Sequence, residues 1–206
     1  MRIYELFISG GPVMWPLLAC SIMAAGVTFE RLFFWALIRT RRNRKLMDTI
    51  LHLAENGEWE QIKEQCRGNR DHVIKMLVVG IQHRDYDMGK AMEAEARHRL
   101  KKMARYMTVL DTMITVSPLL GILGTVLGII TSFKMLGAGG VADPKLVTGG
   151  IAQALITTAA GLTISIATVF PYNYFKSRIE HAAHIMEKYA TSLEVVYTRM
   201  NRREQP

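Results

Sequence analysis

Two long uncharged runs, separated by a short connecting stretch, limit what this chain can fold into more than any other feature. The first run covers residues 112–133, and the second covers residues 146–175. Each exceeds the roughly 20 consecutive apolar residues that an α-helix needs to cross a bilayer core of about 30 Å. The two runs therefore predict a helical hairpin that spans a membrane.

Composition agrees with membrane spans joined to a substantial polar part. Half of the 206 residues are hydrophobic, whereas 21% are charged. The net charge of +8 could indicate nucleic-acid binding, but the basic residues cluster beside the apolar runs and are not interleaved with aromatic residues for base stacking. We therefore predict no nucleic-acid partner and attribute the positive charge to membrane topology.

A third apolar segment, near the N-terminus, predicts the first transmembrane helix. Residues 6–29 carry no charge, and their prolines suit the start of a helix better than its middle. We expect a span from about Val13 to Phe29 that continues to Trp35. The sequence Leu17–Cys20 resembles a lipoprotein cleavage site, but apolar residues continue beyond the cysteine, so we expect a membrane span and not a cleaved signal.

Lysine and arginine residues near the ends of the spans predict the orientation of the chain. The opposite side of the expected membrane carries only Arg2, Lys134 and Lys145. We therefore predict that the N-terminus faces outside and that the long loop and the C-terminus are cytoplasmic. Arg31, directly after the first uncharged run, is expected to extend its guanidinium toward water. The clusters on the cytoplasmic side lie within residues 39–45, 97–105 and 176–178, and include Arg41 and Arg42.

The polar region between the first two spans predicts helices and not disorder. Apolar residues at helical spacing indicate three short helices, of which the first ends at Asn56–Gly57, the second ends near Gly68 and the third begins close to Asp71. Asp87 suits the N-cap of a fourth helix, which we expect to continue without a break into the second span. Apolar residues from Ile179 to Val196 predict that the third span also extends as a helix.

The sequence therefore predicts an all-α membrane protein with three transmembrane helices and a helical cytoplasmic region, in which two of the helices extend into the cytoplasm. The expected parts are an N-terminal segment with the first transmembrane helix (1–38), a cytoplasmic helical region (39–105), the second transmembrane helix (106–133), a short external loop (134–145), the third transmembrane helix (146–175) and a cytoplasmic C-terminal helix (176–206).

Small and hydroxyl-bearing residues recur every three or four positions in both hairpin runs, so each set lies along one face of its helix. Because lipid is as apolar as leucine, membrane helices associate through close backbone approach over such residues, and the two stripes mark either protein contact or a lumen. A threonine hydroxyl can also bond to a carbonyl one turn earlier without any further role. The stripes contain Ser117, Gly121, Gly124, Thr125, Gly128 and Ser132 in the first run, and Gly150, Ala154, Thr157, Thr158, Gly161, Ser165 and Thr168 in the second.

The same runs carry motifs of a known family. Residues Pro118–Gly128 resemble the second-helix signature of the MotA/TolQ/ExbB proton-channel family, and residues Gly150–Leu162, followed by Pro171–Asn173, resemble its third-helix signature. The chain is closest to the ExbB and TolQ branches. The resemblance implies a ring-forming subunit, a pentamer, of a bacterial inner-membrane motor that is driven by the proton motive force and energises transport or an envelope process.

The resemblance also implies partners. Neither uncharged run contains Asp, Glu, Lys, Arg or His, so this chain has no group inside the hairpin that could load and release an ion. In the family, a smaller single-span protein resembling ExbD, TolR or MotB carries a membrane aspartate, and five copies of this chain would enclose a dimer of that partner. A TonB- or TolA-like protein and membrane lipid are the other partners that the resemblance implies.

The stripes and the resemblance together predict an ion pathway. Thr125 and Thr158 lie near the middle of their helices, where a hydroxyl has no water unless the structure supplies it. Asp111 is either an interfacial partner of a basic residue such as Arg105 or the cytoplasmic mouth of the pathway. Gln153 stands where several ExbB and TolQ relatives have an acidic residue, so we expect it to bond across helices for assembly. The pathway set is Thr125, Thr158, Thr157, Ser165 and Asp111, and the helix-packing set is Gly121, Gly124, Gly128, Gly150, Gln153 and Gly161.

Two other functions stay open at this point: a membrane scaffold without ion flow, and a self-sufficient ion channel.

We predict no enzyme, no cofactor and no metal site. No glycine-rich phosphate loop follows a strand, and His181 and His184 have no third ligand nearby in the sequence. Cys20 and Cys66 fall in different expected compartments, so they cannot pair.

Overall fold

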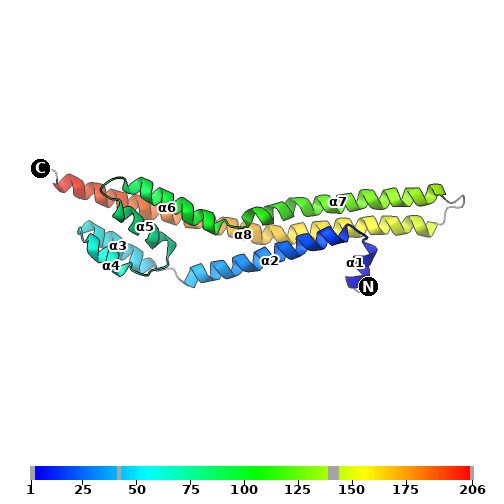
Figure 1. Ribbon diagram of the computed structural model, residues 1–206, viewed down its shortest axis with the longest axis horizontal. Coiled ribbons are helices and arrows are strands. Elements are labelled where there is room, and N and C mark those ends of the chain that lie inside the picture. The colour runs from blue at the N-terminus through cyan, green and yellow to red at the C-terminus, as the bar shows by residue number, and fades with distance from the viewer. Residues whose placement is uncertain (1–2, 41–42, 139–143, 205–206) are drawn as a thin grey trace. The chain divides into compact units, whose positions relative to one another are not determined.

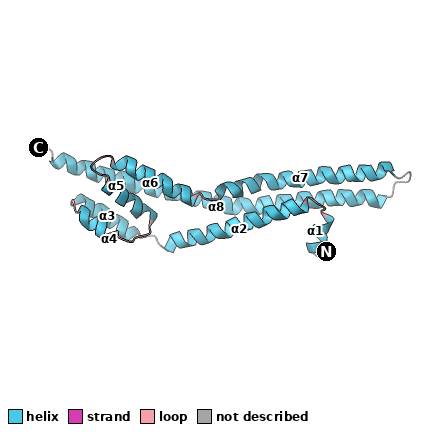
Figure 2. Ribbon diagram, viewed as in Figure 1, coloured by secondary structure: helices cyan, strands magenta, loops and turns pink. Residues whose placement is uncertain are grey.

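The computed structural model describes residues 3–40, 43–138 and 144–204, with side chains described for all of these except residues 3, 135–138, 144–147 and 203–204. Every regular element within these residues is an α-helix (Figures 1 and 2). The helices are α1 (Ile3–Ser9), α2 (Met14–Thr40), α3 (Arg44–Glu55), α4 (Trp59–Gln65), α5 (His72–Gln82), α6 (Met88–Met103), α7 (Met107–Ala138) and α8 (Pro144–Glu204).

The chain forms two compact units. The first, here called the span unit, contains residues Met1–Arg31 and Tyr106–Phe175, and the second, here called the polar unit, contains Leu32–Arg105 and Lys176–Pro206. Helices α2 and α8 each contribute one part to either unit. The predicted all-α membrane fold is confirmed, because three helices are long and apolar enough to cross a membrane, namely α2, α7 and α8.

The span unit packs α2, α7 and the first part of α8 with a small interior. Cys20 and Ala24 of α2 are buried against Met113 of α7, and Val116 and Leu120 pack on the same cluster. Many larger apolar side chains of the three helices face outward instead. An apolar exterior of this kind suits lipid or neighbouring membrane proteins as its surroundings.

Helix α1 is an element that the sequence did not predict. It ends before a turn in which Gly11 has a φ of 71°, and α2 begins at Met14 after this turn. Gly10, Gly11 and Pro12, which indicated the start of the first span, therefore form the connection between two helices, whereas Pro16 lies in the first turn of α2. A left-handed residue at this turn favours glycine because glycine has no Cβ.

The polar unit places α3, α4, α5 and α6 beside the C-terminal part of α8 (Figure 1). Its core consists of large apolar side chains with almost no exposed surface. Two tyrosines of α8 fix the contact further, since the Tyr189 hydroxyl bonds to Asp48 at 2.9 Å and the Tyr197 hydroxyl donates to the Arg84 carbonyl at 2.9 Å. The buried core residues include Met47, Ile50, Ile62, Ile74, Leu77, Ile81, Met92 and, from α8, Met186 and Leu193.

Four helix boundaries that the sequence predicted in this unit are confirmed. Gly57 and Gly68 have φ angles of 75° and 78°, directly after the ends of α3 and α4. The Asp71 carboxylate accepts from the Val73 amide at 2.8 Å at the start of α5. The Asp87 carboxylate accepts from the Lys90 amide at 2.9 Å at the start of α6.

The expected continuous helix from Asp87 into the second span is wrong. Helix α6 ends at Met103 and α7 begins at Met107, and Tyr106 between them has a φ of 65°. A left-handed non-glycine residue costs energy and persists only where its surroundings hold it. The Arg31 guanidinium lies over the Tyr106 ring, 5.6 Å from its centroid, which holds the ring in place.

The expectation that Arg31 reaches water is also wrong. Its side chain is only 2% exposed, and its Nη2 donates to Glu30 Oε1 at 2.6 Å. The carboxylate of Glu30 and the ring of Tyr106 replace water around the guanidinium, so burial does not leave the charge without compensation.

Several expectations fall on residues outside the described ranges. Arg2, Arg41 and Arg42, which contributed to the predicted orientation, lie there. So do residues 139–143 of the expected external loop, between the end of α7 and the start of α8.

The third span continues as a helix to Glu204, as the apolar spacing predicted.

Replacing Asp71 with alanine should destabilise the polar unit by about 1–2 kcal/mol. Asp71 is only 6% exposed, and its second oxygen also accepts from the Asn43 amide at 3.1 Å, so the substitution removes two hydrogen bonds. Thermal unfolding of the detergent-solubilised protein, followed by circular dichroism, measures the loss. Asp87→Ala, which removes an exposed cap, is the control and should cost less. Equal losses would contradict the two-bond role of Asp71.

Candidate functional site

The α7–α8 seam, as we call the line of contact between these two helices in the span unit, is lined by the small residues of both stripes. Gly161 is so close to α7 that an added Cβ would lie 2.4 Å from the Ser117 carbonyl oxygen. A Cβ on Gly124 would lie 2.4 Å from Thr157 Oγ1, and one on Gly121 would lie 3.0 Å from the Thr157 carbonyl oxygen. The helix backbones can approach this closely only because these positions have no side chain.

The end of the seam near Ser132 has the same construction. A Cβ on Gly128 would lie 2.8 Å from the Gly150 carbonyl oxygen, and one on Gly150 would lie 2.0 Å from Ser132 Oγ. The stripe glycines Gly121, Gly124, Gly128, Gly150 and Gly161 thus all lie between α7 and α8 of one chain.

Two threonine hydroxyls meet near the middle of the seam. Thr125 Oγ1 of α7 and Thr158 Oγ1 of α8 are hydrogen-bonded to each other. Thr158 Oγ1 can also donate to the Gly121 carbonyl at 3.1 Å, and Thr125 Oγ1 can donate to the Ala154 carbonyl at 3.2 Å. Both bonds cross from one helix to the other, so these hydroxyls do more than satisfy carbonyls of their own helix. Both side chains are half-buried.

The other hydroxyls of the seam are more deeply buried. Thr157 has no exposed surface and donates to the Ala154 carbonyl of its own helix at 2.9 Å. Ser165 donates across the seam to the Ile114 carbonyl at 2.7 Å. Ser117 is also fully buried, and its hydroxyl has no hydrogen-bond partner among the described residues. Thr157 and Ser165 therefore lie in helix contacts.

Asp111 and Gln153 do not join the threonines. Asp111 is exposed near the start of α7. The Gln153 amide lies against the turn before α2, because a Cβ on Gly11 would be only 2.0 Å from Gln153 Nε2. Within one chain, Gln153 therefore packs on the α1–α2 connection.

The chemistry of the seam is limited to hydrogen bonding. Hydroxyls and carbonyls can accept from or donate to a bound proton carrier, but neither titrates near neutral pH. The uncharged runs supply no carboxylate, amine or imidazole. No group of three His, Cys, Asp or Glu residues in the described part of the chain could hold a metal ion.

A buried and a half-buried group of the polar unit have perturbed pKa values. Burial raises the pKa of the Cys66 thiol to about 11, so the nucleophilic thiolate is disfavoured at neutral pH. Burial, reinforced by Arg99, lowers the pKa of His72, which favours its neutral form. Sequence reasoning missed one feature of this unit, a basic cavity beside His72, because most of its cations were interpreted only as topology signals and Arg70 and Lys75 were not singled out.

The fold and the seam together define an all-α membrane protein whose transmembrane hairpin is closely packed, hydroxyl-bearing and uncharged. The family model of the "MotA/TolQ/ExbB proton channel family" matches residues 68–188. The chain therefore belongs to this family, as its two helix motifs indicated.

Curated relatives cover most of the chain. It is 32% identical over 200 residues to the biopolymer transport protein ExbB-like 3 of Synechocystis sp., with 94% of each chain covered. It is 38% identical over 191 residues to the Tol-Pal system protein TolQ of Pseudomonas aeruginosa, covering 84% of this chain and 83% of that protein. It is 29% identical over 168 residues to the biopolymer transport protein exbB1 of Vibrio cholerae, covering 77% and 72% respectively.

Substituting Gly161 with alanine should push α7 and α8 apart and lower the free energy of unfolding by about 1–3 kcal/mol, because the methyl group meets a backbone oxygen that cannot move alone. The measurement is thermal unfolding of the purified protein in detergent. Gly26→Ala in α2 is the matched control, since a Cβ there meets nothing within 4 Å. A similar loss in both variants would show that the seam has room to adapt.

Proposed function

We propose that this chain forms the ring of a proton-driven motor in the bacterial inner membrane, in which five copies enclose two copies of a single-span partner. The observation that carries the proposal is the neutral seam with bonded hydroxyls at its centre. A family of proton channels needs a titratable group within the membrane, and the two uncharged runs of this chain contain no Asp, Glu, Lys, Arg or His. The partner must therefore bring that group, as a membrane aspartate.

The energies allow an aspartate to work beside such a seam. An ionised carboxylate at mid-membrane costs about 3 kcal/mol on insertion scales, and one charge that crosses about 150 mV releases about 3.5 kcal/mol. Hydroxyls of Thr125 and Thr158 would stabilise the ionised form by hydrogen bonds, because both side chains are half-buried and not sealed inside the seam. Protonation would then allow the carboxyl group to pass the apolar remainder of the ring, and alternation of the two states would rotate the partner.

The other predicted positions take supporting roles in this proposal. Exposed Asp111 would form the cytoplasmic mouth of the pathway, with the N-terminus outside and the C-terminus in the cytoplasm. Gly121, Gly124, Gly128, Gly150 and Gly161 would keep α7 and α8 in register. Gln153 would hold the α1–α2 turn. Relatives named for biopolymer transport and for the Tol-Pal system support transport or envelope maintenance as the process that the motor energises. A TonB- or TolA-like protein would transmit the energy to that process.

A scaffold without ion flow is the second candidate. The observation that favours it is that Thr157 and Ser165 are used in helix contacts, so part of the hydroxyl stripe is explained by packing alone. A self-sufficient channel is a third, and it differs by requiring no partner.

Native mass spectrometry of this chain, expressed with the single-span, aspartate-bearing protein encoded nearest to it, tests the assembly first. We expect a five-to-two complex released from membranes. An oligomer that never takes up a partner would reject the motor, and conductance of that lone oligomer in liposomes would favour the channel over the scaffold.

Thr158→Val removes the central hydroxyl but keeps the shape of the side chain. We expect at least a tenfold loss of proton-dependent function while the five-to-two complex stays intact. Thr168→Val is the matched control, because this buried hydroxyl of α8 donates only to the Ile164 carbonyl of its own helix. Unchanged function in Thr158→Val would favour the scaffold.

The same assay tests the proposed role of Asp111. Asp111→Asn removes the charge with little change in shape, and proton flow should slow if this carboxylate forms the mouth. Flow equal to that of the unmodified chain would leave Asp111 as an interfacial residue only.

A further inference from the structure

The polar unit contains a cavity of about 720 Å³ that the motor does not use. Its walls come from the end of α2, the starts of α3 and α5, the end of α6 and the part of α8 that follows Lys176. All of its lining residues belong to the polar unit, so the cavity is complete within one compact part of the chain.

The charge around this cavity is strongly unbalanced. Seven lining side chains are lysines or arginines, and Asp71 is the one carboxylate among them. Both oxygens of Asp71 already accept backbone amides, from Val73 and Asn43. Arg99 is paired with Glu95, which lies outside the lining. The cations are Arg39, Arg44, Arg70, Lys75, Arg99, Lys102 and Arg178.

Three polar nitrogens in the cavity wall are buried without a hydrogen-bond partner among the described residues. They are Trp35 Nε1, Arg178 Nε and His72 Nδ1. Trp35 is only 6% exposed, and the Arg178 guanidinium lies 5.7 Å from the centroid of its ring. The indole and guanidinium nitrogens can only donate, and His72 Nδ1 donates in one tautomer. Buried donors in native proteins normally have an acceptor, so the wall lacks an acceptor-rich group.

Part of the cavity lining is apolar and belongs to the end of α2, a helix long and apolar enough to cross a membrane. Phe34, Leu37 and Ile38 belong to the last turns of this helix, before its apolar sequence ends at Arg39. Ile185 and Met186 of α8 extend the apolar side. The cavity therefore combines a hydrocarbon-like wall with a cationic wall at the level where a span leaves the bilayer, which is where phospholipid headgroups lie.

We propose that this cavity binds the phosphate headgroup of an anionic phospholipid, of which phosphatidylglycerol is the probe of choice. The phosphate is neutralised by the surrounding cations, while an acyl chain lies along Phe34, Leu37 and Ile38. Burial is the main cause of the lowered pKa of His72, and Arg99, Lys75 and Lys102 lower it further; these nearby cations favour an anion as the occupant. The proposal does not depend on ion flow through the seam.

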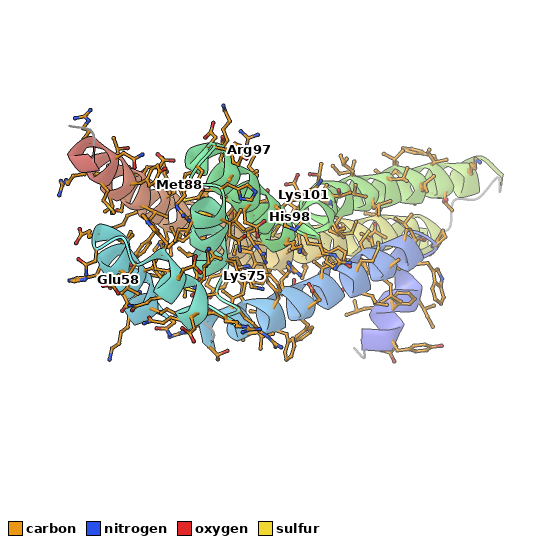
Figure 3. The ribbon with its side chains drawn as sticks, turned by 60° about the vertical axis from the view of Figure 1, so that its left-hand side comes forward. Glu58, Lys75, Met88, Arg97, His98 and Lys101 are labelled. Atoms are coloured by element: carbon orange, nitrogen blue, oxygen red, sulfur yellow. The ribbon has the colours of Figure 1, made fainter. Side chains whose placement is uncertain are left out.

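Lipid titration followed by native mass spectrometry tests this site in the full-length protein. The unmodified chain should bind phosphatidylglycerol at least tenfold more tightly than phosphatidylcholine. The double variant Lys75→Gln with Arg178→Gln should lose this preference. The matched control, Arg97→Gln with Lys101→Gln, changes the net charge equally at positions of α6 that do not line the cavity, and should keep it (Figure 3). Equal losses in both double variants would reject the site in favour of general electrostatic attraction.

A fluorescence measurement locates the lipid without altering the basic wall. In a variant that keeps Trp35 as its single tryptophan, phosphatidylglycerol with brominated acyl chains should quench the emission at low lipid ratios, and brominated phosphatidylcholine should not. A variant that keeps only Trp59, which does not line the cavity, is the control and should not be quenched. Equal quenching by both lipids would overturn the proposal. Displacement of the lipid by millimolar inorganic phosphate would also overturn it, because the occupant would then be a soluble anion.

Discussion

Hydrocarbon offers no hydrogen-bond partner, and this constraint shapes the whole span unit. Hydroxyls in the α7–α8 seam need acceptors within the protein, and those that have one use backbone carbonyls of their own helix or of the facing helix. Glycines let the two helices come close enough for bonds that cross the seam. Gly121 illustrates this, since Thr158 donates to its carbonyl across a contact where a Cβ would lie only 3.0 Å from the Thr157 carbonyl oxygen. The close packing of α7 and α8 and the hydrogen bonds that cross the seam therefore depend on the same small residues.

This construction determines what the hairpin can contribute to ion movement. A seam of hydroxyls and carbonyls can stabilise a charge that another molecule brings, but it cannot generate or remove that charge. The buried Arg31, near the end of the first span, is paired with the partly exposed Glu30 and lies over the Tyr106 ring, so its charge is already compensated. Membership of a proton-channel family and an uncharged hairpin are compatible only if the titrating group is supplied from outside the chain.

Sequence patterns predicted the fold where the determinants are local. Four residues act at helix ends through their own backbone or side chain, so the sequence alone was enough to predict their roles. They are Gly57 and Gly68, which follow helices, and Asp71 and Asp87, which precede them. The break at Tyr106 could not be predicted from local sequence, because the guanidinium that lies over the Tyr106 ring belongs to Arg31, which is distant in the sequence. The stripes predicted the facing surfaces of α7 and α8, but spacing alone could not distinguish a hydroxyl that bridges two helices, such as Thr125, from one that bonds within its own helix, such as Thr157.

The basic cavity was missed for a different reason. Lysine and arginine at the ends of three spans are required for orientation, and this requirement explains each of them individually. It does not explain where the folded chain brings them together. Once α2, α5, α6 and α8 converge, cations such as Arg39, Arg99 and Arg178 share one cavity, and Asp71 is the one carboxylate among the described residues that line it. The residues that determine which side of the membrane a loop occupies therefore also concentrate positive charge in this cavity. Anionic lipid, which such a charge attracts, is concentrated at the same bilayer surface.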